Sequence, residues 1–469
     1  MTEDKASGQV HAAPVSAGTD LDEFDPFITH RKDPHRFFAE ARRSRPVFYS
    51  PKLEAWCVTM HGDIERVLRD GELFSCRDHN PRPPSTLSSE LLHALKTWRG
   101  SAPPMGSIDG AEHTRIRALA GRGFTARALN HYRTEVTDTA HTMCDQLASS
   151  LRFDFIADFA YPFPLTVVLK VLGVPREYHD RCRDWTELRI AVLLPREAPS
   201  EDVQRRCLVG LRKFAEMSCT VVAERLREPR EDLISYMLHS EVRGHRMTPA
   251  EVLAKIPTLI SAGHESTAQG LAALVRRLLA TDGWRQVADG TLDVEALVEE
   301  TLWYDVPIAG FFRTATRDCE LSGVAIPRGT WLFLAYASGS RDEAVFSAPD
   351  AFDPARPNTR SHLAFGGGPH HCVGRRAGPS RTRRGDGGAG RALPPARSGP
   401  GTGRRLPGPV PAACDERLRG AAARGACRLS TGAAGDHRRV HPPTRGSSTG
   451  LTTASLSMSR SGSPMSASG

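Results

Sequence analysis

The sequence predicts a mainly α-helical fold with a small β-region. Apolar residues recur at helical spacing over two long stretches, 127–227 and 249–280, and this period is the main signal of an amphipathic helix. Short apolar runs at 47–60 and 311–335 are typical of strands. With 469 residues, the chain is long enough to bury a large core, in one large domain or two smaller ones.

The first predicted elements are short. Residues 1–22 are polar and contain prolines, so we expect a disordered leader there. The pattern then predicts a helix, a pair of strands and a second helix, at 34–43, 47–50 with 56–60, and 63–69.

A region rich in Pro and Ser, 75–106, follows and is predicted to form a long loop with a brief helix at 88–95. Loops of this length are usually functional or disordered. In the next helix, 109–117, His113 and Arg117 are four residues apart and therefore lie on one face. Two cations on one face can bind two carboxylates, although such a pair more often forms a solvated surface.

The two long helical stretches differ in continuity. The first, 127–227, has connectors at 174–175 and 195–199. The second, 249–280, is predicted to be one helix that Pro257 kinks near its start.

Within this second stretch lies a run of small, acidic and hydroxyl residues: Ala262, Gly263, His264, Glu265, Ser266 and Thr267. Small residues at 262 and 263 would let the helix pass close to a flat cofactor. An acid beside an alcohol can relay protons. The alternative is ordinary helix crowding with a capping-type glutamate.

The remaining elements lead to a glycine-rich loop. A helix at 294–305, a strand at 311–315, and a turn at 326–330 before a strand at 331–335 are predicted. The loop itself, 365–374, presents a single cysteine, Cys372.

Glycine has no Cβ and tolerates positive φ, so this loop allows a flat group to approach closely and allows turns that aim amides at the sulfur. In that setting the Cys372 thiolate can ligate iron. The alternatives are a buried structural cysteine and a zinc site made by His370, His371 and Cys372. Adjacent residues cannot all point at one tetrahedral ion, and no Cys-x-x-Cys or His-x-x-x-His pair lies nearby to complete four ligands.

Charge is distributed unevenly along the chain. The whole sequence has 62 basic and 54 acidic residues, a net charge of +8. Residues 377–469 hold 15 Arg and 4 acidic residues, so residues 1–376 retain 47 basic and 50 acidic residues and a net charge near −3. The main part of the chain is therefore not basic, which argues against a nucleic-acid-binding enzyme.

Cysteine usage and hydropathy point to the cytoplasm. The ten cysteines show no paired spacing and no secretory signal precedes them, so a reducing compartment is expected. No apolar run approaches the roughly 20 residues needed to span a bilayer, so no membrane association is expected.

The cysteine loop resembles the haem-binding signature of the cytochrome P450 family, which it matches at Phe365, Gly368, His370, Cys372 and Gly374. The resemblance covers about residues 23–376 and implies a haem domain of that extent, with heme b (iron protoporphyrin IX) held by this loop and Cys372 as axial ligand. It implies a monooxygenase that inserts one atom of dioxygen into a small organic substrate, with electrons from a ferredoxin or flavodoxin-type partner.

The resemblance also assigns roles to upstream residues. It implies that the haem propionates are bound by His113, Arg117, Arg313 and His362. Ala262 and Gly263 match the small residues of the family's distal helix, and Glu265, Ser266 and Thr267 match its proton-delivering acid and alcohol.

Two positions depart from the family pattern. Ser266 stands where threonine is usual, and serine lacks the methyl group that stiffens the side chain. Trp303 replaces the arginine of the Glu-x-x-Arg motif that begins at Glu300. Arg356 matches a later arginine of the family and is left to pair with Glu300 alone, since a buried unpaired carboxylate would cost several kcal/mol.

Residues 377–469 contain no Phe, Trp, Tyr or Lys and are rich in Gly, Ala, Pro, Ser and Arg. This composition predicts a disordered tail in place of the helix that follows the cysteine in the family. One choice of codons for 377–381, read one nucleotide later, encodes Leu-Ala-Arg-Leu, which points to a reading-frame change near Arg376. The alternatives to a monooxygenase are a haem-binding or inactive product lacking that helix, and a peroxide-using or isomerising haem-thiolate enzyme.

Overall fold

The computed structural model describes residues 21–26, 30, 33–97, 102–148, 152–193, 198–281 and 283–377. The predictions for residues 1–20, and those for the tail and the frame change at 378–469, lie outside the described residues. The predicted leader ends too late, because Leu21–Glu23 form a short 3-10 helix, η1, in which the Leu21 side chain is buried. The Phe24 ring stacks on Phe37 with 4.5 Å between ring centroids, so apolar packing already orders the chain at this point.

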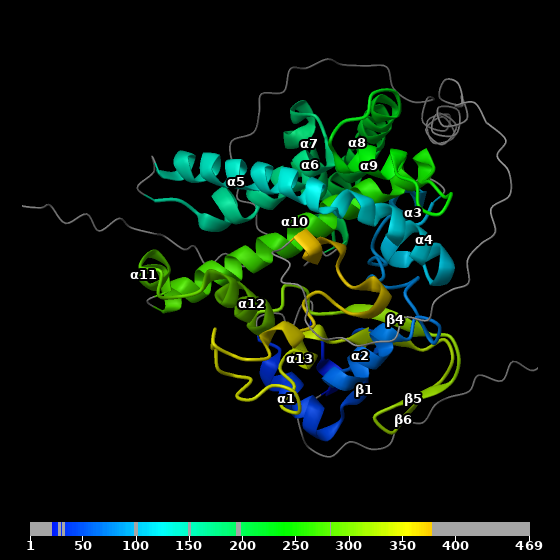
Figure 1. Cartoon of the computed structure of the whole chain (residues 1–469). Helices are drawn as coiled ribbons and strands as arrows, with labels where there is room; N and C mark the ends of the chain where they lie inside the picture. The colour runs from blue at the N-terminus through cyan, green and yellow to red at the C-terminus, as the bar shows by residue number, and fades with distance from the viewer. Residues whose placement is uncertain are drawn as a thin grey trace, which may run out of the picture.

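Helices make up most of the described chain, as predicted (Figure 1). The α-helices of the described residues are α1 (His35–Ser44), α2 (His61–Arg69), α3 (Ser89–Thr97), α4 (Gly110–Ala120), α5 (Ala126–Ala148), α6 (Pro162–Leu172), α7 (His179–Leu193), α8 (Glu201–Arg227), α9 (Leu233–His239), α10 (Pro249–Ala280), α11 (Gly283–Ala288), α12 (Val294–Tyr304) and α13 (Tyr336–Gly339). Shorter turns of helix are η2 (Met105–Ser107), η3 (Gly121–Phe124), the π-helical η4 (Ile156–Ala160), η5 (Arg176–Tyr178), η6 (Thr359–Ser361), η7 (Gly368–His370) and η8 (Val373–Ala377).

Five short strands form one sheet, in the order β1-β2-β7-β4-β3. Neighbouring strands are antiparallel except β2 and β7, which are parallel. Two further strands, β5 and β6, form a separate antiparallel pair. The strands are β1 (Val47–Ser50), β2 (Ala55–Val58), β3 (Phe74–Ser75), β4 (Phe311–Ala315), β5 (Cys319–Leu321), β6 (Val324–Ile326) and β7 (Trp331–Leu334). In Figure 1 the sheet with α1, α2 and α13 occupies the lower part of the view, and α5 to α9 occupy the upper part.

α10 runs between these two parts in Figure 1. It begins with a capping box, in which the Thr248 hydroxyl accepts from the Glu251 amide at 3.2 Å and the Glu251 carboxylate accepts from the Thr248 amide at 2.8 Å. The helix continues through Pro257 to Ala280. Its apolar side, with Val252, Ile256 and Ile260, packs into a cluster shared with α4, α6, α8 and α9.

The predicted bounds coincide with the structure at β1, β4 and α10. The second strand, Ala55–Val58, begins one residue and ends two residues before the predicted 56–60, and α2 begins at His61, two residues before the predicted start. The short strands β3, β5 and β6 are not predicted from the sequence, because two or three residues are too few to show an alternating pattern. Among the described residues, no helix is long and apolar enough to cross a lipid bilayer.

Candidate functional site

The loop that carries Cys372 closes as a tight backbone turn. The Cys372 amide donates to the Phe365 carbonyl at 2.9 Å, and both Gly366 and Gly368 have positive φ, at 63° and 60°. A Cβ on Gly368 would lie 2.0 Å from the carbonyl oxygen of Leu68, so the loop needs glycine there to reach the end of α2. The Cys372 side chain itself is exposed.

Hydrogen-bond donors from two separate elements, α4 and β4, gather beside this loop. The His113 ring of α4 stacks on the His370 ring with 3.9 Å between centroids. Arg117, one turn further along α4, donates to the carbonyl oxygen of His371. Arg313 of β4 is 6% exposed and lies close enough to His370 for its charge to influence that imidazole. The helical spacing of His113 and Arg117 therefore does bring both residues to the cysteine loop.

Two of these residues, His113 and Arg313, have no carboxylate hydrogen-bonded or ion-paired to them among the described residues. The His113 side chain is 3% exposed, and its buried Nε2 has no hydrogen-bond partner there. Arg313 donates to the backbone oxygen of Phe312 at 2.7 Å and has no ion pair within that part of the chain. Burial, then the charges of His113 and Arg313, lowers the pKa of His370 to about 3. The cluster is therefore short of negative charge.

Asp109 is the acid whose charge acts on both His113 and His370, and its carboxylate already has hydrogen-bond partners. Its carboxylate accepts from the Ser75 hydroxyl at 2.6 Å and from the Cys76 amide at 2.9 Å. The Cys76 sulfur lies 3.3 Å from His370 Nε2. Within the described residues, Cys76, Asp109 and His370 are the group whose possible metal-ligating atoms lie within 4.8 Å of one another. Cys372 is not part of it, so the geometry does not support a zinc site at 370–372.

His362 lies beside Glu299 of α12. Its Nε2 lies 3.4 Å from Glu299 Oε2, and its Nδ1 accepts from the Ala364 amide at 3.1 Å. This contact is the main reason that the pKa of Glu299 is lowered. His362 Nε2 is buried and has no hydrogen-bond partner among the described residues, so its contact with a propionate stays a prediction.

The acid and alcohol of α10 are held by different partners. The Ser266 hydroxyl donates to the Ala262 carbonyl one turn earlier at 2.7 Å. Glu265 Oε1 accepts from the Ser261 hydroxyl at 2.9 Å and lies 3.7 Å from Arg189 Nη2 of α7. Ala262, Ser266 and Gln269 lie on one incompletely buried stripe of this otherwise central helix, and Thr267 is exposed on another side.

Gly263 packs beside a neighbouring helix. A Cβ at this position would lie 3.0 Å from Cγ2 of Val168, on α6. The small size of Gly263 therefore allows the close packing of α6 against α10, and the contact of Gly263 with a cofactor stays a prediction. Neither this neighbour nor Arg189 could be recognised from the sequence, because both come from helices distant in the chain.

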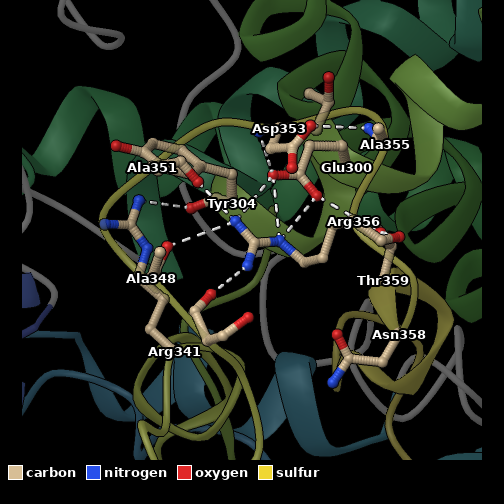
Figure 2. Close-up of polar contacts among 12 residues, drawn as sticks. Glu300, Tyr304, Arg341, Ala348, Ala351, Asp353, Ala355, Arg356, Asn358 and Thr359 are labelled. Atoms are coloured by element: carbon tan, nitrogen blue, oxygen red, sulfur yellow. Dashed lines mark hydrogen bonds and ion pairs between the residues drawn. The ribbon is translucent and has the colours of Figure 1, made fainter.

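A buried ion pair joins α12 to the segment that leads toward the cysteine loop (Figure 2). Arg356 Nε lies 3.3 Å and 3.2 Å from the two carboxylate oxygens of Glu300. Glu300 is fully buried, and burial raises the pKa of its carboxyl although Arg356 opposes this. The predicted pairing of Glu300 with Arg356 is therefore present.

Comparisons with known proteins agree with this arrangement. The family model for Cytochrome P450 matches residues 294–379. Nocardicin C N-oxygenase of Nocardia uniformis subsp. tsuyamanensis is 34% identical over 68% of this chain and 77% of its own length. Cytochrome P450 109 of Bacillus spizizenii is 30% identical over 73% of this chain and 80% of its own length. The crystal structure of a P450 heme domain from Tepidiphilus thermophilus is 27% identical, with a TM-score of 0.69 over 76% of this chain and 87% of that one.

These relatives match more than two thirds of this chain, and the matched part contains a mainly helical fold with its small sheet. The chain therefore belongs to the cytochrome P450 family of haem-thiolate monooxygenases.

Proposed function

We propose that the Cys372 thiolate would hold the iron of a heme b group, in a domain of about residues 21–376. The observation that carries this proposal is a set of donors whose neighbouring acid, Asp109, is already hydrogen-bonded to Ser75 and Cys76. His113, Arg313 and His370 come together beside Cys372, and no free carboxylate faces them among the described residues. A haem propionate supplies the missing acceptor.

The fit of these residues to haem follows from their chemistry. The unpartnered Nε2 of His113 would donate to a propionate oxygen, and Arg313 would add a charge that partial burial strengthens. Arg117 would act from the side, because its guanidinium already holds the His371 carbonyl and so fixes the loop. Phe365 and Gly374 would border the thiolate, with Gly374 leaving its side of the sulfur free.

When bound, the haem supplies dioxygen activation, which the electron-rich thiolate ligand promotes. The residues of α10 would control protons. Ser266 is positioned by the Ala262 carbonyl, so its hydroxyl is oriented before any ligand enters. Glu265 would deliver protons to this hydroxyl after leaving Ser261 and Arg189, and Thr267 would supply a second alcohol at the next position.

The reaction consumes dioxygen and an organic substrate and draws electrons from a redox partner. We propose a ferredoxin or flavodoxin-type donor, a small organic substrate and a cytoplasmic location. The cysteines of the described residues are free thiols, which fits a reducing compartment. A peroxide-using or isomerising enzyme is the second candidate, and retention of Glu265 and Ser266 favours the monooxygenase.

Haem titration of substituted proteins tests this proposal. Arg313→Met and His113→Phe should each weaken haem binding at least tenfold, because each removes a donor to a propionate. Arg317→Met is the matched control, since Arg317 is exposed four residues further along and should leave affinity unchanged. If all three variants bind haem as tightly as the parent chain does, the donor cluster does not hold the cofactor.

A further inference from the structure

We infer that Trp303 is a positioning residue for Arg356: its ring holds the guanidinium against Glu300 by cation–π stacking and takes the place of the arginine of the Glu-x-x-Arg motif. This inference concerns the buried network of α12 and does not depend on how haem is bound.

The stacking geometry is close. The Arg356 guanidinium carbon lies 3.7 Å from the centroid of the Trp303 ring. Trp303 and Glu300 are fully buried, and Arg356 is 7% exposed. Exclusion of water strengthens the attraction of a cation to an aromatic face, and tryptophan is the strongest of the aromatic partners.

The edge of the guanidinium is occupied, so only its faces remain for Trp303. Its Nε points to Glu300, one terminal nitrogen donates to the Ser347 carbonyl, and the other donates to the Ala351 carbonyl at 2.6 Å. Figure 2 shows dashed lines for contacts around the labelled Arg356 side chain. These hydrogen bonds prevent the guanidinium from rotating within its plane. The Trp303 ring, which lies against one face, prevents it from moving perpendicular to that plane.

Charge balance explains why an aromatic ring suits this position. Glu300 and Arg356 form a one-to-one pair, and the Asp353 amide supplies a further donor to Glu300 Oε1 at 2.7 Å. A second arginine at 303 would be fully buried beside this pair with one carboxylate shared between two cations. Trp303 stabilises Arg356 without adding that uncompensated charge.

The indole N–H shows that the ring face is the important part of Trp303. Its Nε1 is buried and has no hydrogen-bond partner among the described residues. The ring also packs on Phe346 with 5.4 Å between centroids. A phenyl ring would therefore preserve the stacking and remove an unsatisfied donor.

The network has a consequence for the site because of what Arg356 anchors. Its donors hold carbonyls of residues 347–351, and its own carbonyl accepts from the Thr359 hydroxyl at 2.8 Å. This segment continues through η6 into the loop that carries Cys372. Trp303 therefore acts on the cysteine loop through Arg356.

Urea unfolding of the full chain, followed by far-UV circular dichroism, tests the inference without requiring haem. Trp303→Phe should unfold at a midpoint below that of the parent but clearly above those of Trp303→Leu and Trp303→Arg, because the phenyl ring keeps the stacking in weaker form and fills less volume. A Trp303→Arg protein as stable as the parent would overturn the inference, because an arginine would then serve equally well.

A second measurement separates stacking from mere packing. Tryptophan analogues with one, two and three ring fluorines at position 303 keep the shape of the indole while weakening its attraction for a cation. The urea midpoint should fall stepwise with each fluorine, and in an Arg356→Met background the steps should disappear. A midpoint that ignores fluorination in the parent background would show that Trp303 only fills space.

Discussion

Arg189 of α7 and Glu265 of α10 form an ion pair at 3.7 Å, and both side chains contact the Ser261 hydroxyl. The pair joins two helices whose charged residues are 76 positions apart in the sequence, and it turns the acid of α10 toward α7. Glu265 is therefore either a partner of Arg189 alone or a proton donor that Arg189 restrains.

The two roles of Glu265 predict different kinetics. Glu265→Gln should lower the rate of product formation by about 10²-fold, a typical contribution of general acid–base catalysis. Arg189→Met should lower it much less, because it releases the acid without removing it. Steady-state product formation at saturating reductant measures both. Equal losses in the two variants would mean that Glu265 serves only the ion pair.

Ser266 should govern how electrons are used. Since its hydroxyl is the alcohol fixed to the Ala262 carbonyl, Ser266→Ala should divert reducing equivalents to hydrogen peroxide. Ser266→Thr should couple electrons to product at least as well as the parent, because the added methyl group restricts the side chain. The ratio of product to electrons consumed reports the effect. An unchanged ratio in the alanine variant would move the relay elsewhere.

Arg356 should be the cation on which Glu300 depends. Arg356→Leu leaves a fully buried carboxylate without its ion-pair partner and should lower the free energy of unfolding by about 3 to 5 kcal/mol. In that background Trp303→Arg should restore part of the loss, because the new arginine would then be the single cation beside Glu300. Urea unfolding of the single and double variants checks both statements. A stable Arg356→Leu protein would mean that Glu300 has another partner.

Lys255 should make stability depend on pH. The side chain is 3% exposed, and its Nζ donates to the Pro103 carbonyl at 2.6 Å. Burial lowers the pKa of Lys255 from 10.5 to about 8. The charges of Glu251 on α10 and Glu112 on α4 raise this pKa, and that of Arg115 on α4 lowers it.

Because the folded-state pKa of Lys255 lies below the unfolded value, the folded state binds fewer protons between pH 8 and 10.5. The contribution of Lys255 to the free energy of unfolding therefore rises as pH increases through this window, by about 3 kcal/mol in all. Lys255→Met should be more stable than the parent at pH 7, and the two should converge toward pH 10.5. Parallel pH profiles of the urea midpoint would contradict this expectation.

Sequence patterns predict well those elements in which the apolar period repeats over many residues or a capping signal marks an end. α10 has both a capping box and an uninterrupted apolar side, and its predicted bounds match the structure. The four-residue spacing of His113 and Arg117 likewise predicts a shared face, which in the structure meets the cysteine loop.

Contacts between distant segments are where the sequence gives too little information. A glycine at 263 would suit close approach either to a cofactor or to a neighbouring helix. The sequence does not show that Val168 of α6 lies against it. His362 is in contact with Glu299 because α12 packs near the cysteine loop, and no local sequence pattern predicts that contact. The exchange of an arginine for Trp303 is visible in the sequence, but the stacking on Arg356 follows from tertiary structure alone.

Cys372 should hold the haem iron as a thiolate. The most direct measurement is the absorption spectrum of the reduced, carbon monoxide-treated protein, compared between the parent chain and Cys372→Ala. The parent should show the thiolate-ligated band characteristic of the family, and the alanine variant should lose that band and all oxygenation even if a histidine of the loop still retains haem. A parent chain without the thiolate band, or an alanine variant with full turnover, would contradict the assignment of Cys372.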